Sequence, residues 1–293
     1  MKILNNCPLC NSEQIIAVHK IPDHFLSGQV FTVSQCNECG FRFTNPRPNA
    51  DALGAYYQSN AYIAHSNTQK GFIAFTYQRI RNYTIHRKIA RISALHPAGS
   101  LLDIGCATGE FLAACRKKGW KVTGVEPDEK AASFATQHFH LNVFPETALK
   151  TFADGSFEVI TLWHVLEHVD SLHERVEEIY RLLAPGGLAV VAVPNPACYD
   201  AHHYGTFWAA WDVPRHLSHF SPSNMISLFC SSHGFRYLKS FPMLFDAFYI
   251  SMLSEKYRSR KMHFFRALSS GIVSNFNAMK TGQYSSLTYI FIK

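Results

Sequence analysis

Residues 101–126 read LLDIGCATGEFLAACRKKGWKVTGVE, and this stretch decides the fold. The apolar run 101–104 predicts a buried strand, and the glycine-bounded segment 105–109 predicts a tight turn that feeds a helix. We expect the helix to end at Gly119, before a second strand that ends at Glu126. A strand, a glycine turn, a helix and another strand are typical of an open α/β sheet.

The glycine turn and Glu126 together predict a pocket for a nucleoside. Gly105 and Gly109 carry no Cβ and can adopt positive φ, so a ligand can lie against the turn and the first helical N–H groups. A carboxylate at the end of the next strand, such as Glu126, can accept hydrogen bonds from both hydroxyls of a ribose.

The pattern D-x-G-x-x-x-G at 103–109 differs from the dinucleotide pattern G-x-G-x-x-G and lacks the Lys-Ser/Thr of a phosphate loop. It resembles the first motif of class I S-adenosylmethionine (SAM)-dependent methyltransferases. The resemblance continues through PETALKTFADGSFEVITLWHVLEHV (145–169) and RLLAPGGLAVVAVPN (181–195). It covers roughly two thirds of the chain in a consistent order, which disfavours a chance glycine turn in another doubly wound protein. It implies a Rossmann-like α/β fold with seven strands, the last antiparallel.

The resemblance also implies a set of cofactor-binding residues. Asp103 and the turn backbone would orient the methionine part of SAM, and Glu126 would hold the ribose. Glu146 and Thr147 align with the pair that contacts adenine, although Glu replaces the commoner Asp. Trp163 and His164 follow the fourth strand, where residues of this family line the methyl-transfer gap. The implied SAM-binding set is Asp103, Gly105, Cys106, Ala107, Gly109, Glu126, Pro127, Glu146, Thr147, Trp163 and His164.

Composition sets broad limits on the protein. A chain of 293 residues with 47% hydrophobic content can form one α/β domain with attachments. The net charge of +7 favours acidic partners such as nucleotides, phosphates, nucleic acid or lipid headgroups. No apolar run reaches membrane-spanning length and no signal-peptide core is visible, so we expect a cytoplasmic protein.

Four of the eight cysteines form two C-x-x-C pairs, Cys7/Cys10 and Cys36/Cys39. Two such knuckles can place four thiolates around a tetrahedral Zn²⁺ ion. The alternative, a redox C-x-x-C, would need a βαβ context that is absent here. We therefore expect one structural zinc, a zinc-ribbon-like module over 1–45, and loss of that module alone in a Cys36→Ser variant.

The rest of the chain divides into two predicted parts. Residues 46–98 are helical by pattern, and the linker TNPRP (44–48) leads into them. Tyr56, Tyr57 and Tyr62 in this part resemble the N-terminal cap that many of these methyltransferases fold over the cofactor, and packing on the sheet edge is the alternative. Residues 99–293 form the predicted methyltransferase domain.

The acceptor side of the reaction is expected to use histidines and an arginine. His164 and His168 are four residues apart and are predicted to share one helix face, where a histidine can take a proton near neutral pH. The run WDVPRHLSHFSP (211–222) adds Arg215, His216 and His219. We predict that these three bind an anionic acceptor or help to deprotonate it, so that Arg215→Ala and His219→Ala lower turnover but spare SAM affinity. The alternatives are a packing role for His168 and a buried polar network that braces the fifth strand.

Residues 243–282 are predicted to be a helical insertion between the last two strands. Basic residues between 256 and 266 alternate with aromatic ones in this segment. The insertion can cap the acceptor, make a peripheral contact with an anionic membrane, or present an ordinary solvated basic face.

Three functions are compatible with these features. The favoured one is a methyltransferase for a small or carrier-linked, anionic metabolite, with a sugar nucleotide or glycan intermediate as first choice, because the run 211–222 resembles bacterial methyltransferases of surface-glycan pathways. The second is a zinc-containing rRNA or tRNA methyltransferase, but the base-methylating N-P-P-Y pattern is absent and no stacking platform is visible. The third is a non-catalytic cofactor-fold binding protein, which the intact Asp103, Gly105, Gly109 and Glu126 set disfavours.

Overall fold

A computed structural model describes residues 1–57 and 72–293 of the chain, except for the side chains of residues 50, 51 and 72–77. Tyr62, expected in the cap, lies outside the described residues. The chain divides into two compact units, each built from separate segments. The first unit comprises Met1–Gln58, His164–Val176 and Val191–Ile290, and the second comprises Ser59–Trp163, Glu177–Val190 and Phe291–Lys293. The predicted boundaries at residues 45 and 98 stay predictions.

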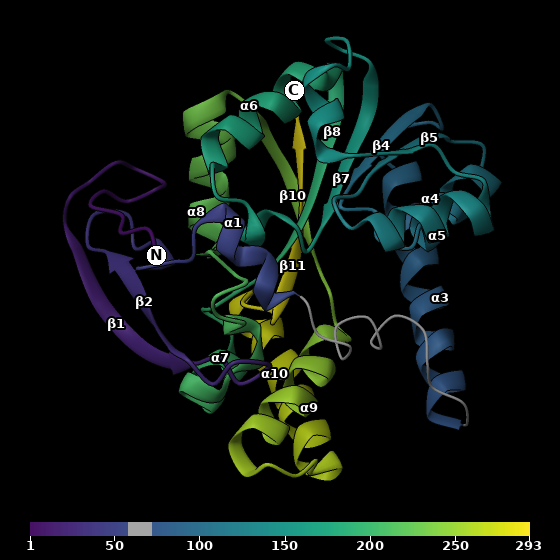
Figure 1. The fold of residues 1–293 in the computed structure, drawn as a ribbon. Helices are drawn as coiled ribbons and strands as arrows, with labels where there is room; N and C mark the ends of the chain where they lie inside the picture. Colours follow the sequence, from purple (N-terminus) through teal and green to yellow (C-terminus); the bar gives the residue numbers. More distant parts are fainter. Residues whose placement is uncertain (58–71) are drawn as a thin grey trace. The chain divides into compact units, whose positions relative to one another are not determined.

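A seven-stranded sheet confirms the fold predicted from residues 101–126 (Figure 1). β4 pairs in parallel with both β5 and β7. The last strand, β11, is antiparallel to its neighbours β8 and β10. Its start lies beside their ends, because the carbonyl oxygen of Ser285 accepts from the N–H of Asn195 and that of Ser286 accepts from the N–H of Met243. The strand order is β10 (Arg236–Pro242), β11 (Ser286–Ile292), β8 (Leu183–Pro194), β7 (Phe157–Trp163), β4 (Ser100–Ile104), β5 (Lys121–Val125) and β6 (Val143–Phe144).

Helices connect the parallel strands where the sequence predicts them. The Asp128 side chain accepts from the N–H of Ala131 and caps α5, as expected for an aspartate at a helix start. The central strands β4 and β7 are mostly buried apolar runs, as expected for parallel strands covered on both faces. α3 (Phe72–Ser93) precedes the first of these strands, and the connections are α4 (Glu110–Lys117), α5 (Glu129–Phe139), the 3-10 turn η2 (Glu146–Lys150) and α6 (Leu172–Leu182).

The first unit contains a second, four-stranded sheet that the sequence did not predict. Its order is β1 (Ile15–Pro22), β2 (Val30–Cys36), β3 (Arg42–Thr44) and β9 (Ser218–His219). β9 comes from the WDVPRHLSHFSP run and pairs antiparallel with β3. Ile21 and Phe31 of this sheet share one buried core with Trp208 and Trp211. The cysteine-bearing segment and the 199–219 segment therefore fold as one body.

Short helices and one helical pair complete the first unit. The predicted insertion contains α9 (Asp246–Ser259) and α10 (Phe264–Thr281), which lie side by side (Figure 1). A Cβ at Gly271 would lie 2.5 Å from a ring carbon of Phe248, so glycine permits their close approach. Among the described residues, no helix is long and apolar enough to cross a membrane. The other elements are α1 (Ala50–Leu53), η1 (Gly54–Tyr56), η3 (Leu166–His168), α7 (Tyr199–Tyr204), η4 (Gly205–Phe207), η5 (Ala209–Trp211), α8 (Pro222–Ile226) and a π-helical turn, η6 (Ser227–Ser231).

Candidate functional site

The turn between β4 and α4 has the backbone that its glycines predict. Gly105, Ala107 and Gly109 have φ of 74°, 46° and 83°. A Cβ at Gly109 would lie 2.8 Å from Cβ of Ala135 and 2.7 Å from Cδ1 of Leu141. Gly109 is therefore required both by the left-handed turn and by the close packing of α5 against it.

Glu126 is held against this turn by backbone hydrogen bonds. The N–H of Ala107 donates to one carboxylate oxygen over 2.8 Å, and the N–H of Asp128 donates to the other over 2.9 Å. Each oxygen keeps acceptor capacity for a further hydrogen bond. Burial raises the pKa of Glu126, and the nearby carboxylates of Asp128 and Glu146 raise it further. The structure thus brings Ala107, Glu126 and Glu146 together, as the resemblance implies.

Asp103 is the most deeply buried carboxyl group of this region, with 2% of its surface exposed. Burial raises the pKa of Asp103 to about 7, although the Thr161 hydroxyl donates to it over 2.5 Å. The other predicted cofactor residues surround the same strand ends: Cys106 is buried, Pro127 is exposed, and Glu146 and Thr147 begin η2.

Trp163 ends β7 inside the second unit. Its ring packs edge-on against Phe111 at a centroid distance of 5.3 Å, and Nζ of Lys88 from α3 lies 3.9 Å from the ring centroid. Its buried Nε1 has no hydrogen-bond partner in the part of the chain that the structure describes. This indole N–H is available to a ligand.

The four cysteines predicted to bind metal converge in the first unit. All four sulfur atoms lie within 4.8 Å of one another, and the Cys7–Cys39 and Cys10–Cys36 distances are both 3.6 Å. Tetrahedral zinc with Zn–S bonds of ~2.3 Å requires sulfur separations of about 3.8 Å. The four residues therefore fit a zinc ion.

The two cysteine knuckles have the same backbone turn. The N–H of Asn11 donates to the carbonyl of Cys7, and the N–H of Gly40 donates to the carbonyl of Cys36, each over 2.9 Å. Asn11 and Gly40 both have positive φ, of 63° and 68°. Repetition of one turn on both sides is what two knuckles facing one ion require.

The prediction that His164 and His168 share a helix face is wrong. His164 has φ of 57°, so no helix passes through it, and only the 3-10 turn η3 contains His168. His164 instead lies between two carboxylates, with ring nitrogens 3.3 Å from Glu167 and 3.1 Å from Asp246. Burial opposes the charge, but these partners outweigh it and raise the pKa of His164 to about 9. His164 is an imidazolium near neutral pH and does not accept a proton there.

His168 and His216 lie next to each other, edge to face, with a centroid distance of 4.7 Å. Burial and the neighbouring His216 lower the pKa of His168 to about 4, so it stays neutral. His219 is buried in β9 and packs edge-on against Trp211 at a centroid distance of 4.9 Å. Burial and His216 hold the pKa of His219 well below its usual value.

Arg215 is buried, with 1% of its surface exposed, and pairs with two carboxylates. Its guanidinium donates to Asp23 over 2.8 Å and to Asp212 over 2.6 Å. It also lies 4.8 Å from the centroid of the Phe25 ring. Asp23 in turn accepts three backbone N–H groups of the β1–β2 turn. These contacts favour the bracing role for Arg215, and its role with an acceptor stays a prediction.

Residues 77–240 match a family model described as "Methyltransferase domain". The chain belongs to this methyltransferase family. It is 37% identical over 102 residues to the ubiquinone biosynthesis O-methyltransferase of a Caulobacter species, which covers 32% of this chain and 40% of that relative. It is 25% identical over 154 residues to the malonyl-[acyl-carrier protein] O-methyltransferase of Serratia marcescens, covering 51% and 58%. The chain thus matches about half the length of these relatives.

Solved structures agree on the fold of this methyltransferase. A SAM-dependent methyltransferase from Thermotoga maritima superposes with a TM-score of 0.50 at 22% identity, covering 75% of this chain and 97% of that one. The matched family is the one predicted from the motifs, and the neighbour has the same Rossmann-like fold.

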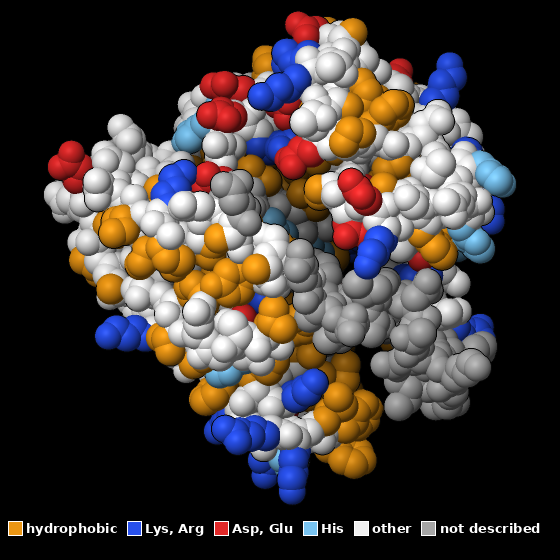
Figure 2. Space-filling model, in the orientation of Figure 1, with side chains coloured by type: hydrophobic (Ala, Val, Ile, Leu, Met, Phe, Trp, Pro, Cys, Tyr) orange, Lys and Arg blue, Asp and Glu red, His pale blue; other side chains and the backbone are white. Residues whose placement is uncertain are grey.

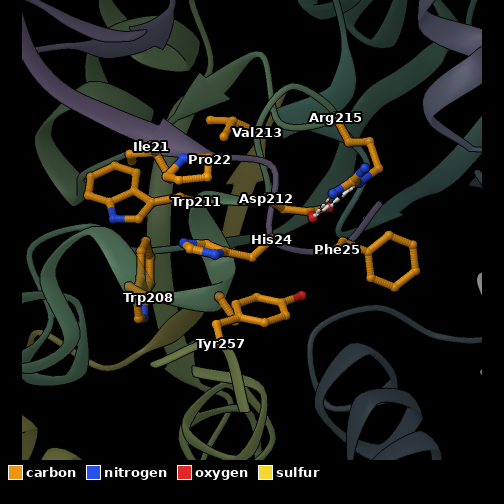
Figure 3. A pocket seen from close by; sticks show the side chains of 11 residues that line it. Ile21, Pro22, His24, Phe25, Trp208, Trp211, Asp212, Val213, Arg215 and Tyr257 are labelled. Atoms are coloured by element: carbon orange, nitrogen blue, oxygen red, sulfur yellow. Dashed lines mark hydrogen bonds and ion pairs between the residues drawn. The ribbon is translucent and has the colours of Figure 1, made fainter. Parts of the chain in front are cut away.

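A small pocket in the first unit includes Arg215 and aromatic side chains (Figure 3). The ring of His24 stacks on Tyr257 of α9 with a centroid distance of 5.1 Å. Dashed lines in Figure 3 mark the contacts of Arg215 with Asp212. Sequence reasoning missed Asp23, Tyr257 and Glu167, because their partners are far away in the chain and no local spacing marks them.

We predict that Arg215→Ala destabilises the first unit by ~3–5 kcal/mol, because it leaves the buried carboxylate of Asp23 without its partner. Thermal and urea unfolding measure this loss. The matched control is Arg236→Ala, which removes an exposed arginine from β10. Equal stability of the two variants would show that the Arg215 pair contributes no net stability.

Proposed function

We propose that this methyltransferase transfers the methyl group of SAM to a small or carrier-linked metabolite. The observation that carries the proposal is the Glu126 carboxylate, fixed by the N–H groups of Ala107 and Asp128 at the end of β5. A fixed acceptor pair at a strand end suits the two hydroxyls of a ribose. The names of the relatives support the acceptor class, since one acts in ubiquinone biosynthesis and one on malonyl-[acyl-carrier protein].

Methyl transfer from a sulfonium is an in-line displacement: the acceptor forms a bond to the methyl carbon as the carbon–sulfur bond breaks. The protein mainly has to hold the donor and acceptor in line and to remove a proton where the acceptor carries one. In the proposed roles, Glu126 holds the ribose, Asp103 and the 105–109 turn orient the methionine part, and Trp163 borders the methyl group. His168, whose pKa burial lowers to about 4, is the candidate for an acceptor-side residue in neutral form.

An activity assay with different acceptor classes shows which kind of acceptor the protein methylates. Formation of S-adenosylhomocysteine can be followed with a sugar nucleotide, with a phenol of the ubiquinone-precursor type and with a carboxylate on an acyl carrier. We propose the sugar nucleotide or glycan intermediate first, from the run 211–222, and the two relatives supply the other acceptors.

Glu126→Ala is expected to weaken SAM binding by ~1.5–3 kcal/mol, because it removes charged hydrogen bonds to the ribose. Calorimetric titration with SAM measures the change. Glu129→Ala, which removes an exposed glutamate three residues further on, is the matched control and should bind SAM as the unmodified protein does. Unchanged affinity of Glu126→Ala would contradict the proposed ribose contact.

We also propose that the four cysteines hold one structural zinc ion. Their sulfur distances and paired turns fit a closed tetrahedral site, and four protein ligands leave no position open for chemistry. Zinc would fix the end of β2 and the start of β3, which pair with each other. β9 pairs with β3 on its other side. Removal of zinc is therefore expected to disturb β9 as well as residues 1–45.

Cys36→Ser is expected to abolish the zinc that a thiol-modifying reagent releases from the protein, since it removes one of four thiolates. A zinc-sensitive dye measures the release. Cys230→Ser, a cysteine outside the cluster, should release zinc normally. Freshly purified, reduced protein that releases no zinc would refute the proposed site.

The outer face of α10 supports a further partner, an anionic membrane surface. Phe265, Phe276 and Met279 are 81%, 67% and 71% exposed, and they recur at helical spacing. The opposite, buried face consists of small residues: Ala267, Ser270, Gly271, Ser274 and Ala278. The large apolar side chains of this helix therefore point into solvent. Their contact with water is unfavourable, and a second apolar surface would remove it.

Basic side chains accompany this apolar face. Arg258 lies in the last turn of α9, and Arg260 and Lys261 follow it. Figure 2 shows Lys and Arg side chains beside hydrophobic ones over α9 and α10. An apolar helix face flanked by cations matches an anionic lipid surface, so we propose a peripheral contact there.

Phe265→Ser combined with Phe276→Ser is expected to weaken binding to vesicles that contain anionic phosphatidylglycerol by about tenfold or more, because two aromatic side chains no longer enter the bilayer. Vesicle sedimentation measures the binding. Phe144→Ser removes an exposed phenylalanine of β6 and is the matched control. If the double variant binds like the control, α10 is not the membrane contact.

A further inference from the structure

Three metal-ligating side chains outside the cysteine cluster converge in the first unit. Glu167 and His168 belong to η3, and His216 follows Arg215 just before β9. One ligand atom from each residue lies within 4.8 Å of the others. The metal ligands predicted from the sequence did not include this group.

Hydrogen bonds fix which nitrogen of each histidine is free. The Nδ1 atom of His168 lies 3.0 Å from the carbonyl oxygen of Arg215, and that of His216 lies 2.9 Å from the carbonyl oxygen of Ala210. A carbonyl oxygen can only accept, which favours a proton on each Nδ1, and the Tyr57 hydroxyl 2.9 Å from Nδ1 of His168 then acts as a second acceptor. When Nδ1 carries the proton of a neutral imidazole, the lone pair that can bind a metal is on Nε2. Histidines that bind metals are held in the same way, with the second ring nitrogen donating to a backbone carbonyl.

Glu167 supplies a buried carboxylate that His164 contacts at one of its two oxygens. The residue is 1% exposed, and neither carboxylate oxygen has a hydrogen-bond partner among the described residues. Its nearest ionic partner is His164, 3.3 Å from one of the two oxygens. The other oxygen has no hydrogen-bond partner among the described residues, so it is the one that can bind a cation.

We propose that Glu167, His168 and His216 bind a divalent first-row transition metal ion, with Zn²⁺ or Mn²⁺ as the first candidates. Two imidazoles and one carboxylate form a familiar protein site for such ions. Ligand bonds of 2.0–2.1 Å require donor atoms ~3.3 Å apart, so a bound ion would hold at this separation the three ligand atoms that lie within 4.8 Å of one another.

Charges of both signs surround the three residues, and the His164 imidazolium, 3.3 Å from one Glu167 oxygen, opposes added positive charge. The guanidinium of Arg215 is paired with Asp23 and Asp212, so its charge is neutralised locally. A carboxylate oxygen of Asp212 lies 3.9 Å from Nε2 of His216 and adds negative potential. Three protein ligands leave at least one coordination position open, unlike the four-cysteine site.

The test uses Co²⁺ as the probe, on the full chain and without SAM. Cobalt bound by thiolates has an intense thiolate-to-metal charge-transfer absorption, which a histidine and carboxylate site lacks. We expect the unmodified protein to bind a second equivalent of Co²⁺ with no such absorption. In the cobalt-loaded protein, two hyperfine-shifted imidazole N–H signals in the proton NMR spectrum should report the two protonated Nδ1 atoms. Absence of this second equivalent would overturn the proposal.

Variants show which residues bind the second equivalent of Co²⁺. Glu167→Gln and His216→Gln should each lower its affinity by at least about tenfold, whereas His203→Gln, an exposed histidine of α7, should leave it unchanged. Binding that persists in both Glu167→Gln and His216→Gln would overturn the proposal. If a variant fails to fold, the NMR signals of the unmodified protein decide. A lost SAM contact at Glu126 would leave all these readings unchanged, so the two proposals fail separately.

Discussion

The buried Arg215 ion pair is the constraint on which the first unit depends. A guanidinium at 1% exposure is stable only if its charge is matched, and Asp23 and Asp212 match it from two distant segments. The same residue fixes His168 through its backbone carbonyl. The Arg215 side chain joins the β1–β2 turn to the 212–216 turn. The same ion pairs therefore stabilise both the four-stranded sheet and the cluster of Glu167, His168 and His216. A variant at Arg215 is therefore expected to alter both.

In the second unit, the main constraint is that a polar turn must be held at the ends of buried parallel strands. Three residues of the turn have positive φ, and Glu126 satisfies the N–H groups of Ala107 and Asp128. The carboxylate that is proposed to bind ribose also stabilises the turn. Binding geometry is then largely formed before the ligand arrives, which lowers the ordering cost of binding.

The sequence predicted those features that depend on neighbours in the chain. The strand 101–104, the cap at Asp128 and the two C-x-x-C knuckles each follow from local spacing, and the structure has all of them. It did not predict β9, because a two-residue strand has no periodicity and its partner β3 is distant in the chain. It misassigned His164, because a positive φ at a non-glycine residue overrides helical spacing. Glu167 and His216 approach each other only through tertiary folding.

The two candidate metal centres differ in the property that decides what a metal can do. Four thiolates close the coordination sphere of a zinc ion, and the matched turns at Asn11 and Gly40 exist to aim them. Glu167, His168 and His216 would use only three positions, and their orientation depends on carbonyls of the 210–215 segment. A closed site contributes stability, whereas an open one can polarise a bound oxygen. The sheet containing β9 connects the two, so loss of the closed site would also loosen the segment that orients the open one.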